Sequence, residues 1–530
     1  MGVHVHVGQA KGAARQVCAP LLGCDAMRRT NRNSRRVVAA VALVALGVSA
    51  CSTTSTTDTT SAPSTLAENP DFPIAPIAWS TCEDAPEESP VVCGSLEVPF
   101  DYANPSIGTF QLFVKKRPAD KTAVGPLLVN PGGPGFGGSS LADDAMYYFS
   151  RDLMNAFDII AWDPRGTGQS EPAVDCVDEY DPYAGLDSPP DTEQEKQALI
   201  EASRAFNEMC VERSGAILPY ISTEASARDM NSLRLALGVE KITYMGFSYG
   251  SELGATWVTL FPETVRAAVF DGATDPNSTS IEQGMAQAQG FEQQLSAFLA
   301  QCSLAPSCPF HNNGDSESAF DQLFVDIDAN PLVVSNDRTP VTQGVAYTAV
   351  AQAMYSDYYW RDLERALADA QRGNGKGLLD LYDEYYQRKD DGSYGNELEA
   401  FLAISCLDDR DVATVEEVED YVDDFIAVAP RLGANFAYGY TCVLWPVEAV
   451  TRIAITGMGA GPIVVIGTTG DAATPLSSSR NMAKALENGI LIVVEADQHT
   501  GYGANSCVVD AVDRYLIDLK IPDNGTRCSP

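Results

Sequence analysis

Gly246-Phe247-Ser248-Tyr249-Gly250 follows the β-branched and aromatic residues Ile242-Thr243-Tyr244 and precedes an apolar segment, residues 253–257, that predicts a helix. A G-x-S-x-G sequence between a strand and a helix is typical of a nucleophile elbow, in which the serine occupies a sharp, strained turn. The two glycines matter because side chains beside the serine would clash in so tight a turn. The stretch predicts an α/β fold with Ser248 as a nucleophile at the end of a strand, although the pentapeptide alone is a weak signal.

The choice of a general base is narrow, because the chain has four histidines. His4 and His6 lie in an N-terminal segment that we expect to be removed or never translated. His311 lies between Cys-Pro-Phe and Asn-Asn-Gly, a pattern that predicts a polar loop. His499 lies five residues after the apolar run 491–494, on a loop after a late strand, which is where an α/β-hydrolase keeps its base. We therefore predict His499 as the base.

The acid is predicted by the same logic. Residues 463–467, Ile-Val-Val-Ile-Gly, form the continuous apolar run that a buried parallel strand requires. Asp471 follows on the loop at the carboxyl end of this strand, where open α/β sheets bind ligands. The resulting chain order of serine, aspartate and histidine is that of α/β-hydrolases. Asp471 is the predicted acid, and Asp271 and Asp275, which follow an earlier strand, remain the alternatives.

A glycine-rich loop supplies candidate oxyanion donors. Residues 127–130 predict a strand, and Pro-Gly-Gly-Pro-Gly-Phe-Gly-Gly follows at 131–138. Glycines at this point let backbone N–H groups approach a developing oxyanion without obstruction by side chains. Because Pro134 has no N–H to donate, we predict Gly133 as one donor and the backbone N–H of Tyr249 as the other.

Five motifs occur along the chain in a fixed order: Asn-Pro-Gly-Gly-Pro-Gly at 130–135, Asp-Pro-Arg-Gly-Thr-Gly-Gln-Ser at 163–170 after a predicted strand at 158–162, Gly-Phe-Ser-Tyr-Gly at 246–250, Gly-Asp-Ala-Ala-Thr-Pro at 470–475 and Gln-His-Thr-Gly-Tyr-Gly at 498–503. As a set they resemble the secreted actinobacterial tripeptidyl aminopeptidases, in the prolyl aminopeptidase group of α/β-hydrolases. The related mycobacterial cell-envelope serine hydrolases, described both as carboxylesterases and as proteases, are similar.

The resemblance covers roughly residues 75–530. It implies a catalytic core that carries a cap domain, and a C-terminal segment that supplies the acid and the base. By this resemblance Ser248, Asp471 and His499 are nucleophile, acid and base. Asp163 and Arg165, in the second motif, are expected to brace the active-site loops rather than to perform chemistry.

A chain of 530 residues is too long for one plain α/β core. We predict an α/β-hydrolase core with a mostly parallel central sheet and an inserted, mainly helical cap. The predicted parts are a signal region at 1–51, a Ser/Thr-rich tether at 52–74, the first part of the core at 75–274, the cap at 275–450 and the C-terminal part of the core at 451–530.

The predicted cap is rich in tyrosine and acidic residues. Amphipathic helices are expected at 347–367, 378–388, 398–402 and 415–429. Its tyrosines have two readings, since they can pack between helices or line an access groove over Ser248. The tyrosines concerned are Tyr355, Tyr358, Tyr359, Tyr382, Tyr385 and Tyr386.

The N-terminus has the pattern of an export signal. Five arginines follow Met27, which is a plausible true start, and an apolar run at 37–48 comes next. That run is too short to span a membrane as a helix. Val48-Ser49-Ala50-Cys51 resembles a bacterial lipobox, which would make Cys51 a lipidated first residue, while Ser34-Arg35-Arg36 weakly suggests the twin-arginine route. We expect an envelope lipoprotein on the outer face of the cytoplasmic membrane, or a secreted protein.

Cysteine usage agrees with export. Leaving out Cys18, Cys24 and Cys51, ten of the thirteen cysteines remain, an even number as a disulfide framework requires. No paired histidines accompany them as in a zinc site, and we expect neither a metal nor an organic cofactor. Neighbours in sequence suggest the pairs Cys82–Cys93, Cys176–Cys210, Cys302–Cys308, Cys406–Cys442 and Cys507–Cys528.

The net charge is −37, and it becomes −43 when the segment before Cys51, with seven basic residues and one acidic residue, is left out. This charge argues against nucleic acid and against anionic surfaces as partners. Solubility outside the cell accounts for it, or an acidic pocket for the α-ammonium group of a substrate. Candidate carboxylates for such a pocket are Glu252, Asp408 and Asp409, among which the sequence does not choose.

We expect a monomer that acts on a peptide or an ester and contacts the membrane only through a lipid at Cys51. Three functions remain open for it. The first is a serine aminopeptidase that releases short N-terminal peptides by acyl transfer. The second is an envelope carboxylesterase or endopeptidase with the same triad. The third, a catalytically idle binding lipoprotein, is disfavoured because the serine, aspartate and histidine are all present.

Overall fold

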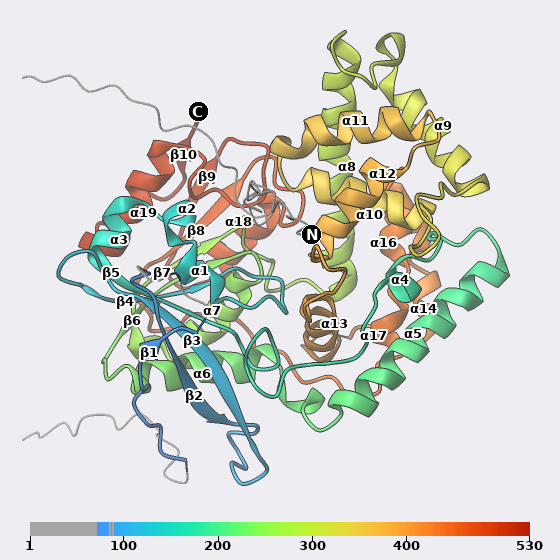
Figure 1. Cartoon of the computed structure of the whole chain (residues 1–530). Helices are drawn as coiled ribbons and strands as arrows, with labels where there is room; N and C mark the ends of the chain where they lie inside the picture. The colour runs from blue at the N-terminus through green and yellow to red at the C-terminus, as the bar shows by residue number, and fades with distance from the viewer. Residues whose placement is uncertain (1–71, 84–85, 87–88, 409) are drawn as a thin grey trace, which may run out of the picture. The chain divides into compact units, whose positions relative to one another are not determined.

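The computed structural model describes residues 72–530 apart from 84–85, 87–88 and 409 (Figure 1). Outside the described residues therefore lie the predicted signal region, the predicted lipidation site Cys51, nearly all of the predicted tether, and Asp409. In the part that is described, no helix combines the length and the apolar composition needed to cross a membrane.

A ten-stranded sheet runs through the described residues in the order β1-β2-β3-β5-β4-β6-β7-β8-β9-β10. The first four strands in this order pair antiparallel, and every later pair is parallel. The predicted α/β fold with a mostly parallel sheet is thus confirmed. The strands are β1 (Ser80–Thr81), β2 (Val92–Pro99), β3 (Thr109–Arg117), β4 (Gly125–Asn130), β5 (Phe157–Trp162), β6 (Ile242–Phe247), β7 (Val265–Asp271), β8 (Ile463–Thr468), β9 (Gly489–Val494) and β10 (Thr526–Cys528).

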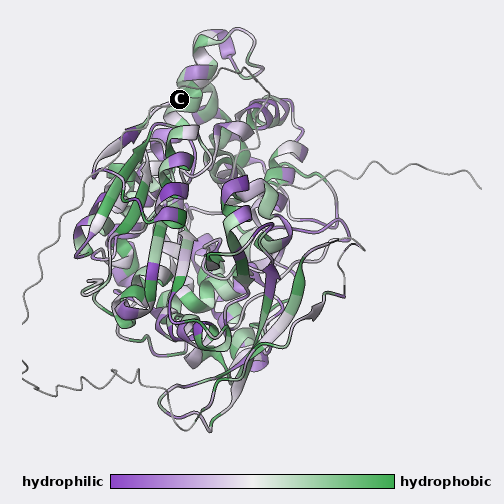
Figure 2. Ribbon diagram, turned by 90° about the vertical axis from the view of Figure 1, so that its left-hand side faces the viewer, coloured by the Kyte–Doolittle hydropathy of each residue, from purple (hydrophilic) through white to green (hydrophobic). Residues whose placement is uncertain are grey.

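The central strands are apolar along their whole length because helices cover both faces of the sheet. Every residue of β6 and β8 is buried. One face packs against α6 (Thr223–Ala236), α7 (Gly250–Leu260) and α18 (Leu476–Ala485). The other packs against α1 (Ser140–Asp143), α2 (Ala145–Tyr148), α3 (Arg151–Ala156) and α19 (Ser506–Asp518). Figure 2 shows long hydrophobic stretches on the strands, whereas the helices mix hydrophobic and hydrophilic turns.

The chain leaves the sheet after β7 and returns to it at β8, and the excursion is helical (Figure 1). These helices have an apolar core of their own, in which residues of α8 to α12 pack together. They are α8 (Ser280–Leu304), α9 (Ser316–Ala329), α10 (Gln343–Met354), α11 (Trp360–Ala370), α12 (Lys376–Tyr385), α13 (Glu397–Asp408), α14 (Val415–Glu419), α15 (Val422–Val428), α16 (Gly433–Ala437) and α17 (Tyr440–Val443).

The helix expected at 347–367 is broken in the structure. The backbone of Ser356 is extended, with φ −161° and ψ 144°, and its side chain accepts a hydrogen bond from the N–H of Tyr358. α10 therefore ends before this point and α11 begins after it. The helix expected at 415–429 is likewise divided between α14 and α15.

One helix of the first core segment joins the cap helices. α5 (Glu193–Ser214), which follows β5 in the chain, packs on α17 and shares a small apolar cluster with α14, through Ile200, Val418 and Tyr440 (Figure 1). Arg338 of the cap also pairs with Asp181 of α4 (Asp181–Ala184), at 2.9 Å. The covering layer is consequently built from two separate stretches of the chain.

The ten cysteines in the described part of the chain form five disulfides, which are the pairs suggested by their order in the sequence: Cys82–Cys93, Cys176–Cys210, Cys302–Cys308, Cys406–Cys442 and Cys507–Cys528. Their Cα–Cα distances run from 4.1 to 5.5 Å. Several of them fasten helices to neighbouring segments, as Cys406–Cys442 does for α13 and α17.

A buried ion pair holds the loop that follows β5. The guanidinium of Arg165 donates to both carboxylate oxygens of Asp229, at 2.8 and 2.5 Å, and to three backbone carbonyls around it. Both side chains are fully buried. Tyr102 donates a further hydrogen bond to Asp229 at 2.7 Å. Every N–H of the guanidinium thus donates to a neighbouring group of the protein. This fits the role expected of Arg165, which is to brace the loop and not to take part in chemistry.

We predict that Asp229→Ala lowers the free energy of unfolding by about 3–5 kcal/mol, because it leaves the buried Arg165 charge without its partner. Urea denaturation followed by circular dichroism measures this loss. Asp369→Ala is the control, since Asp369 pairs with Arg372 at the exposed end of α11 and an exposed pair contributes about 0–1 kcal/mol. Equal small losses in both variants would contradict the prediction.

Candidate active site

Ser248 lies between the end of β6 and the start of α7, in a left-handed backbone conformation with φ 55°. Its N–H donates to the carbonyl of Asp271 at 2.8 Å. A Cβ on Gly246 would lie 2.3 Å from the carbonyl oxygen of Gly250, and one on Gly250 would lie 2.9 Å from Oδ1 of Asn130. Glycine is therefore required on both sides of the turn, as the elbow pattern predicts.

His499 and Asp471 meet at the carboxyl ends of β8 and β9. Nδ1 of His499 lies 2.8 and 3.0 Å from the two carboxylate oxygens of Asp471. The same carboxylate accepts hydrogen bonds from the N–H of Thr474 at 2.8 Å, from its hydroxyl at 3.0 Å and from the N–H of Thr500 at 3.1 Å. Burial lowers the pKa of His499, but the Asp471 charge outweighs it, so that the pKa of His499 is raised. These contacts orient the ring and favour its protonated form.

The cap is joined directly to the loop that carries His499. The N–H of His499 donates to the carbonyl of Tyr355 at 2.7 Å, and the N–H of Asp357 donates to the carbonyl of Asp497 at 3.1 Å. The Tyr355 ring meets the imidazole edge-on, with ring centroids 5.6 Å apart. The break between α10 and α11 makes this possible, because it frees backbone groups that a continuous helix would use internally.

The predicted oxyanion donors lie beside the elbow. Gly133 has φ 108° and lines the same cavity as Ser248 and His499. The neighbouring Gly132 approaches the elbow so closely that a Cβ there would lie 3.2 Å from the backbone nitrogen of Tyr249. The side chain of Tyr249 points elsewhere, with its hydroxyl bonded to Thr223. The backbone of both predicted donors is thus near the nucleophile.

The cavity shared by Ser248, Gly133 and His499 has a volume of about 1,070 Å³. Aromatic rings from core and cap contribute much of its wall: Phe136, Tyr148, Tyr355, Tyr385, Tyr386, Tyr394 and Phe401. Tyr359 and Tyr382 instead pack in the apolar core of the cap, and Tyr358 is exposed. Both interpretations of the cap tyrosines therefore apply, and Tyr355 and Tyr386 fit both, since they line the cavity and also pack against the apolar core of the cap.

The carboxylates predicted to bind a substrate amine lie elsewhere. Glu252 pairs with Arg452 at 3.1 Å. Asp408 accepts hydrogen bonds from the N–H and the hydroxyl of Thr223, at 2.9 and 2.6 Å, and burial raises the pKa of Asp408 to about 7. Neither residue is part of the cavity wall around Ser248. Asp409, the third candidate, is outside the described residues.

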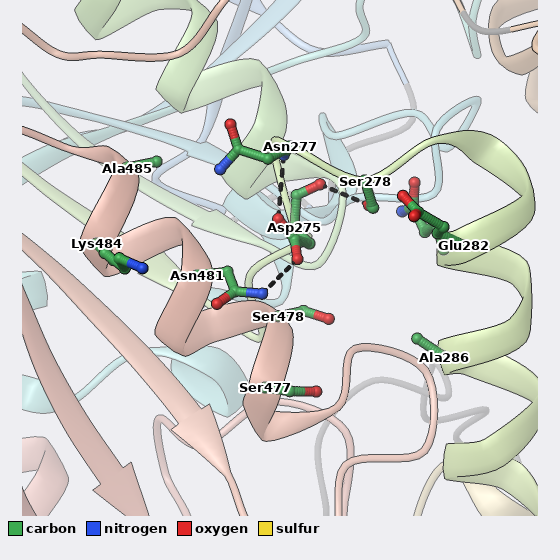
Figure 3. A pocket seen from close by; sticks show the side chains of 11 residues that line it. Asp275, Asn277, Ser278, Glu282, Ala286, Ser477, Ser478, Asn481, Lys484 and Ala485 are labelled. Carbon is green, nitrogen blue, oxygen red and sulfur yellow. Dashed lines mark hydrogen bonds between the residues drawn. The ribbon is translucent and has the colours of Figure 1, made fainter.

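A second cavity, of about 660 Å³, lies between α8 and α18 (Figure 3). Asp275 lines it and accepts a hydrogen bond from the side chain of Asn481 at 2.5 Å. His311 lies in the cap, where its Nδ1 is 3.0 Å from the carbonyl oxygen of Cys302. The structure thus separates both Asp275 and His311 from Ser248, and it brings Asp471 and His499 into contact.

Asp271, the other alternative acid, has a different position. Its two carboxylate oxygens accept hydrogen bonds from the N–H groups of Gly501 and Tyr502, both at 2.7 Å, just after His499. Its own carbonyl receives the N–H of Ser248. Burial, aided by the Asp471 charge, raises the pKa of Asp271 to about 7 although its two backbone donors lower it. Asp271 therefore links the elbow to the histidine loop. The sequence shows only that Asp271 ends a strand, and it does not predict this link.

Comparisons with known proteins agree with this geometry. A family model described as the alpha/beta hydrolase fold matches residues 125–503. The chain is 32% identical over 475 residues to the serine protease Hip1 of Mycobacterium tuberculosis, covering 86% of this chain and 91% of that protein. It is 34% identical over 475 residues to carboxylesterase B of the same species, covering 86% and 90%. It is 29% identical over 486 residues to the tripeptidyl aminopeptidase of Streptomyces lividans, covering 86% and 87%. The resemblance indicated by the five motifs is confirmed.

We predict that Asp271→Asn lowers kcat/KM about 10- to 100-fold, because the amide nitrogen would face a backbone N–H and displace the histidine loop. The acid limb of the pH profile should also move to lower pH. With a pKa of about 7, Asp271 is partly ionised where His499 titrates, and its ionised form raises the pKa of His499; removing that charge leaves the imidazole neutral at more acidic pH.

The measurement is kcat/KM against pH with one ester substrate. Asp275→Asn is the matched control, because Asp275 follows the same strand and lies in the second cavity. A profile of Asp271→Asn that overlaid those of the wild type and this control would show that Asp271 does not position His499.

Proposed function

The chain belongs to the family of α/β hydrolases, and we propose that it is an exported serine aminopeptidase that releases short peptides, tripeptides above all, from free N-termini. The observation that carries this proposal is the cavity that Ser248 and His499 share with the cap. Its wall holds five carboxylates and one lysine among the described residues, which favours a substrate with a positive end. The relative named tripeptidyl aminopeptidase supports the same choice.

In the proposed mechanism, the hydroxyl of Ser248 attacks the substrate carbonyl while Nε2 of His499 takes its proton. Asp471 holds the imidazole through Nδ1 and stabilises the imidazolium. The N–H groups of Gly133 and Tyr249 bind the oxyanion, each contributing about 3 kcal/mol. His499 then gives the proton to the leaving amine. Water, activated by the same base, attacks the acyl-enzyme and releases the peptide.

An envelope carboxylesterase with the same triad is the second candidate. Two observations favour it: the aromatic rings that line the cavity, and the identity of 34% to a relative named carboxylesterase B. Acyl chains bind aromatic walls by burial of apolar surface and need no charged partner. The two candidates differ in what lies beyond the scissile bond, since only an aminopeptidase must recognise an ammonium group.

Export and anchoring belong to the proposal as well. We infer a signal region at 1–51, lipidation at Cys51, a tether to residue 74, a core at 75–274 and 451–530, and a cap at 275–450 that α5 of the first core segment joins, in a protein that acts as a monomer. The five disulfides among the described residues support a location outside the cytoplasm, because such bonds persist in oxidising compartments.

Hydrolysis of two matched substrates tests the function: a tripeptidyl anilide with a free amino terminus, and the same compound N-acetylated. We expect kcat/KM to favour the free amine by at least about tenfold, because the acetyl group removes the charge that the acidic wall attracts. Equal turnover of both, with faster cleavage of simple acyl esters, would move the assignment to the carboxylesterase.

Ser248→Ala tests the nucleophile in the same assay. The variant should lose about 10⁴-fold or more of kcat, as happens when a triad serine is removed. Residual activity near that of the wild type would exclude Ser248 as the nucleophile, whatever the substrate preference.

The anchor is tested by Cys51→Ala in the full chain. We expect the wild type in the membrane fraction and the variant in the soluble exported fraction, because a diacylated cysteine supplies the two chains that stable anchoring requires. Fractionation followed by mass spectrometry of the mature N-terminus measures this. Membrane retention of the variant would contradict lipidation at Cys51.

A further inference from the structure

Five carboxylates line the cavity of Ser248 in the described part of the chain: Asp163, Asp175, Asp178, Glu397 and Glu399. They differ in whether the protein already satisfies them. A buried carboxylate oxygen needs a donor, because leaving it without one costs about as much as a lost hydrogen bond to a charged group, 1–3 kcal/mol or more. An oxygen that the protein leaves unpaired is therefore a candidate site for a donor on the substrate.

Asp163 and Glu399 are satisfied by the backbone. Asp163 accepts hydrogen bonds from the N–H groups of Ser139 and Gln169, both at 2.8 Å. Glu399 accepts one from the N–H of Val177 at 2.8 Å. These carboxylates fix the loops that carry their donors, and they match the bracing role expected of Asp163.

Asp175 and Asp178 share one arginine. Arg213 pairs with them at 3.1 and 2.8 Å, and their side chains are 64% and 82% exposed. They lie where solvent screens them, and their charge is already compensated by a guanidinium.

Glu397 is the remaining member of the five. Its Oε2 is buried and has no hydrogen-bond partner among the described residues. Burial raises the pKa of Glu397, while its own backbone N–H and the nearby Lys389 charge lower it. The ammonium of Lys389 donates to the carbonyl of Tyr394, at 3.4 Å. The Glu397 carboxylate is thus placed in the cavity wall with acceptor capacity that the protein does not use.

A second unpaired group lines the same cavity. Gln352, near the end of α10, is 1% exposed, and its amide nitrogen is buried without a partner within the described ranges. Three residues further on, the carbonyl of Tyr355 receives the N–H of His499. This helix end is fixed against the base, and the unpaired donor of Gln352 is fixed with it.

The start of α13, which carries Glu397, is fastened to the core. The side chain of Asn396 donates to the carbonyls of Gly166 and Val174, at 3.0 and 2.9 Å, and accepts the N–H of Gly168 at 3.1 Å. A Cβ on Gly135 would lie 2.7 Å from the carbonyl oxygen of Glu397, so the first turn of α13 packs on the glycine-rich loop itself. The separation between Glu397 and the oxyanion donors is therefore set by backbone contacts.

We propose that Glu397 binds the α-ammonium group of a peptide substrate and that Gln352 donates a hydrogen bond to a carbonyl oxygen of the same peptide. The inference rests on the proposed aminopeptidase function and assigns its amine site, in place of Glu252, Asp408 and Asp409. A peptide N-terminus offers the two groups that these unpaired atoms need, an ammonium donor for Glu397 and an amide carbonyl acceptor for Gln352. A fixed Glu397 then sets how many residues fit between it and Ser248, and so the length of the released peptide.

Glu397→Gln tests the assignment, because it removes the charge and keeps the shape of the side chain. The quantity measured is the amine preference, the ratio of kcat/KM for the free tripeptidyl anilide to that for its N-acetyl form. We expect this ratio to fall at least about tenfold in the variant, through a higher KM for the free amine. Hydrolysis of p-nitrophenyl butyrate, which has no amine, should stay at the wild-type rate and so report an intact fold and triad.

Glu252→Gln is the matched control, since it makes the same chemical change outside the cavity and should keep the amine preference. A wild type without amine preference would overturn the proposed aminopeptidase and the Glu397 site with it. A wild type with the preference, and a Glu397→Gln variant that retains it, would overturn the Glu397 site alone. Loss of the preference in Glu252→Gln, with Glu397→Gln unaffected, would move the amine site to Glu252.

Product length gives an independent readout. Mass spectrometry of a digested unblocked peptide should show mainly one product length for the wild type and a mixture for Glu397→Gln. A single unchanged length in the variant would show that Glu397 does not set the register.

Gln352→Met tests the second contact, because methionine fills a similar volume and has no donor. We expect kcat/KM to fall about tenfold for the free and the acetylated tripeptidyl anilide alike, as for a lost hydrogen bond to a substrate carbonyl. The butyrate ester should be unaffected. Wild-type values for both anilides would remove Gln352 from the proposal.

Discussion

Asp271 connects the turn of Ser248 to the loop of His499, and the rest of the candidate site depends on that connection. Its carbonyl fixes the N–H of Ser248, and its carboxylate fixes the two N–H groups that follow His499. The elbow is strained, with a serine at φ 55°, and a strained conformation persists only where surrounding contacts determine it fully. One residue at the end of β7 supplies contacts to both partners. The end of β7 thereby positions both Ser248 and the loop that carries His499.

The cap extends this arrangement, because it is bonded to the same loops. The carbonyl of Tyr355 receives the N–H of His499, and Asn396 joins the start of α13 to the loop after β5. The first contact ties a wall of the cavity to the loop that carries His499, and the second ties another wall to the loop that Arg165 and Asp163 brace. A cap connected in this way works as part of the site, since displacing it would also disturb the base.

Much of the fold and of the candidate site could be predicted from the sequence, because the signals are short and local. Such signals are the elbow, the apolar runs of β4, β5, β8 and β9, and the loops that follow these strands. The break at Ser356 was missed, because the helical period continues through it and a pairing with the histidine loop causes it.

Glu252 was a candidate because it lies one turn after Ser248. Its direction on α7, toward Arg452, depends on packing that periodicity does not encode. No sequence pattern points to Glu397. Whether its oxygen is unpaired depends on the positions of all the donors around it in the folded protein, and these cannot be read from the sequence.

The relatives named as a protease, a carboxylesterase and an aminopeptidase are consistent with this division of labour. Acyl transfer needs a nucleophile, a base, an acid and an oxyanion hole, and these come from strand ends that the fold fixes. In our proposal, the choice between an ester and a peptide amine is made further along the cavity, by side chains of the cap that take no part in bond breaking. In this proposal the unpaired carboxylate of Glu397 gives a preference of about tenfold for an ammonium group, which corresponds to about 1.4 kcal/mol. On this proposal, a relative that kept the core and changed such residues would change substrate without rebuilding the chemistry.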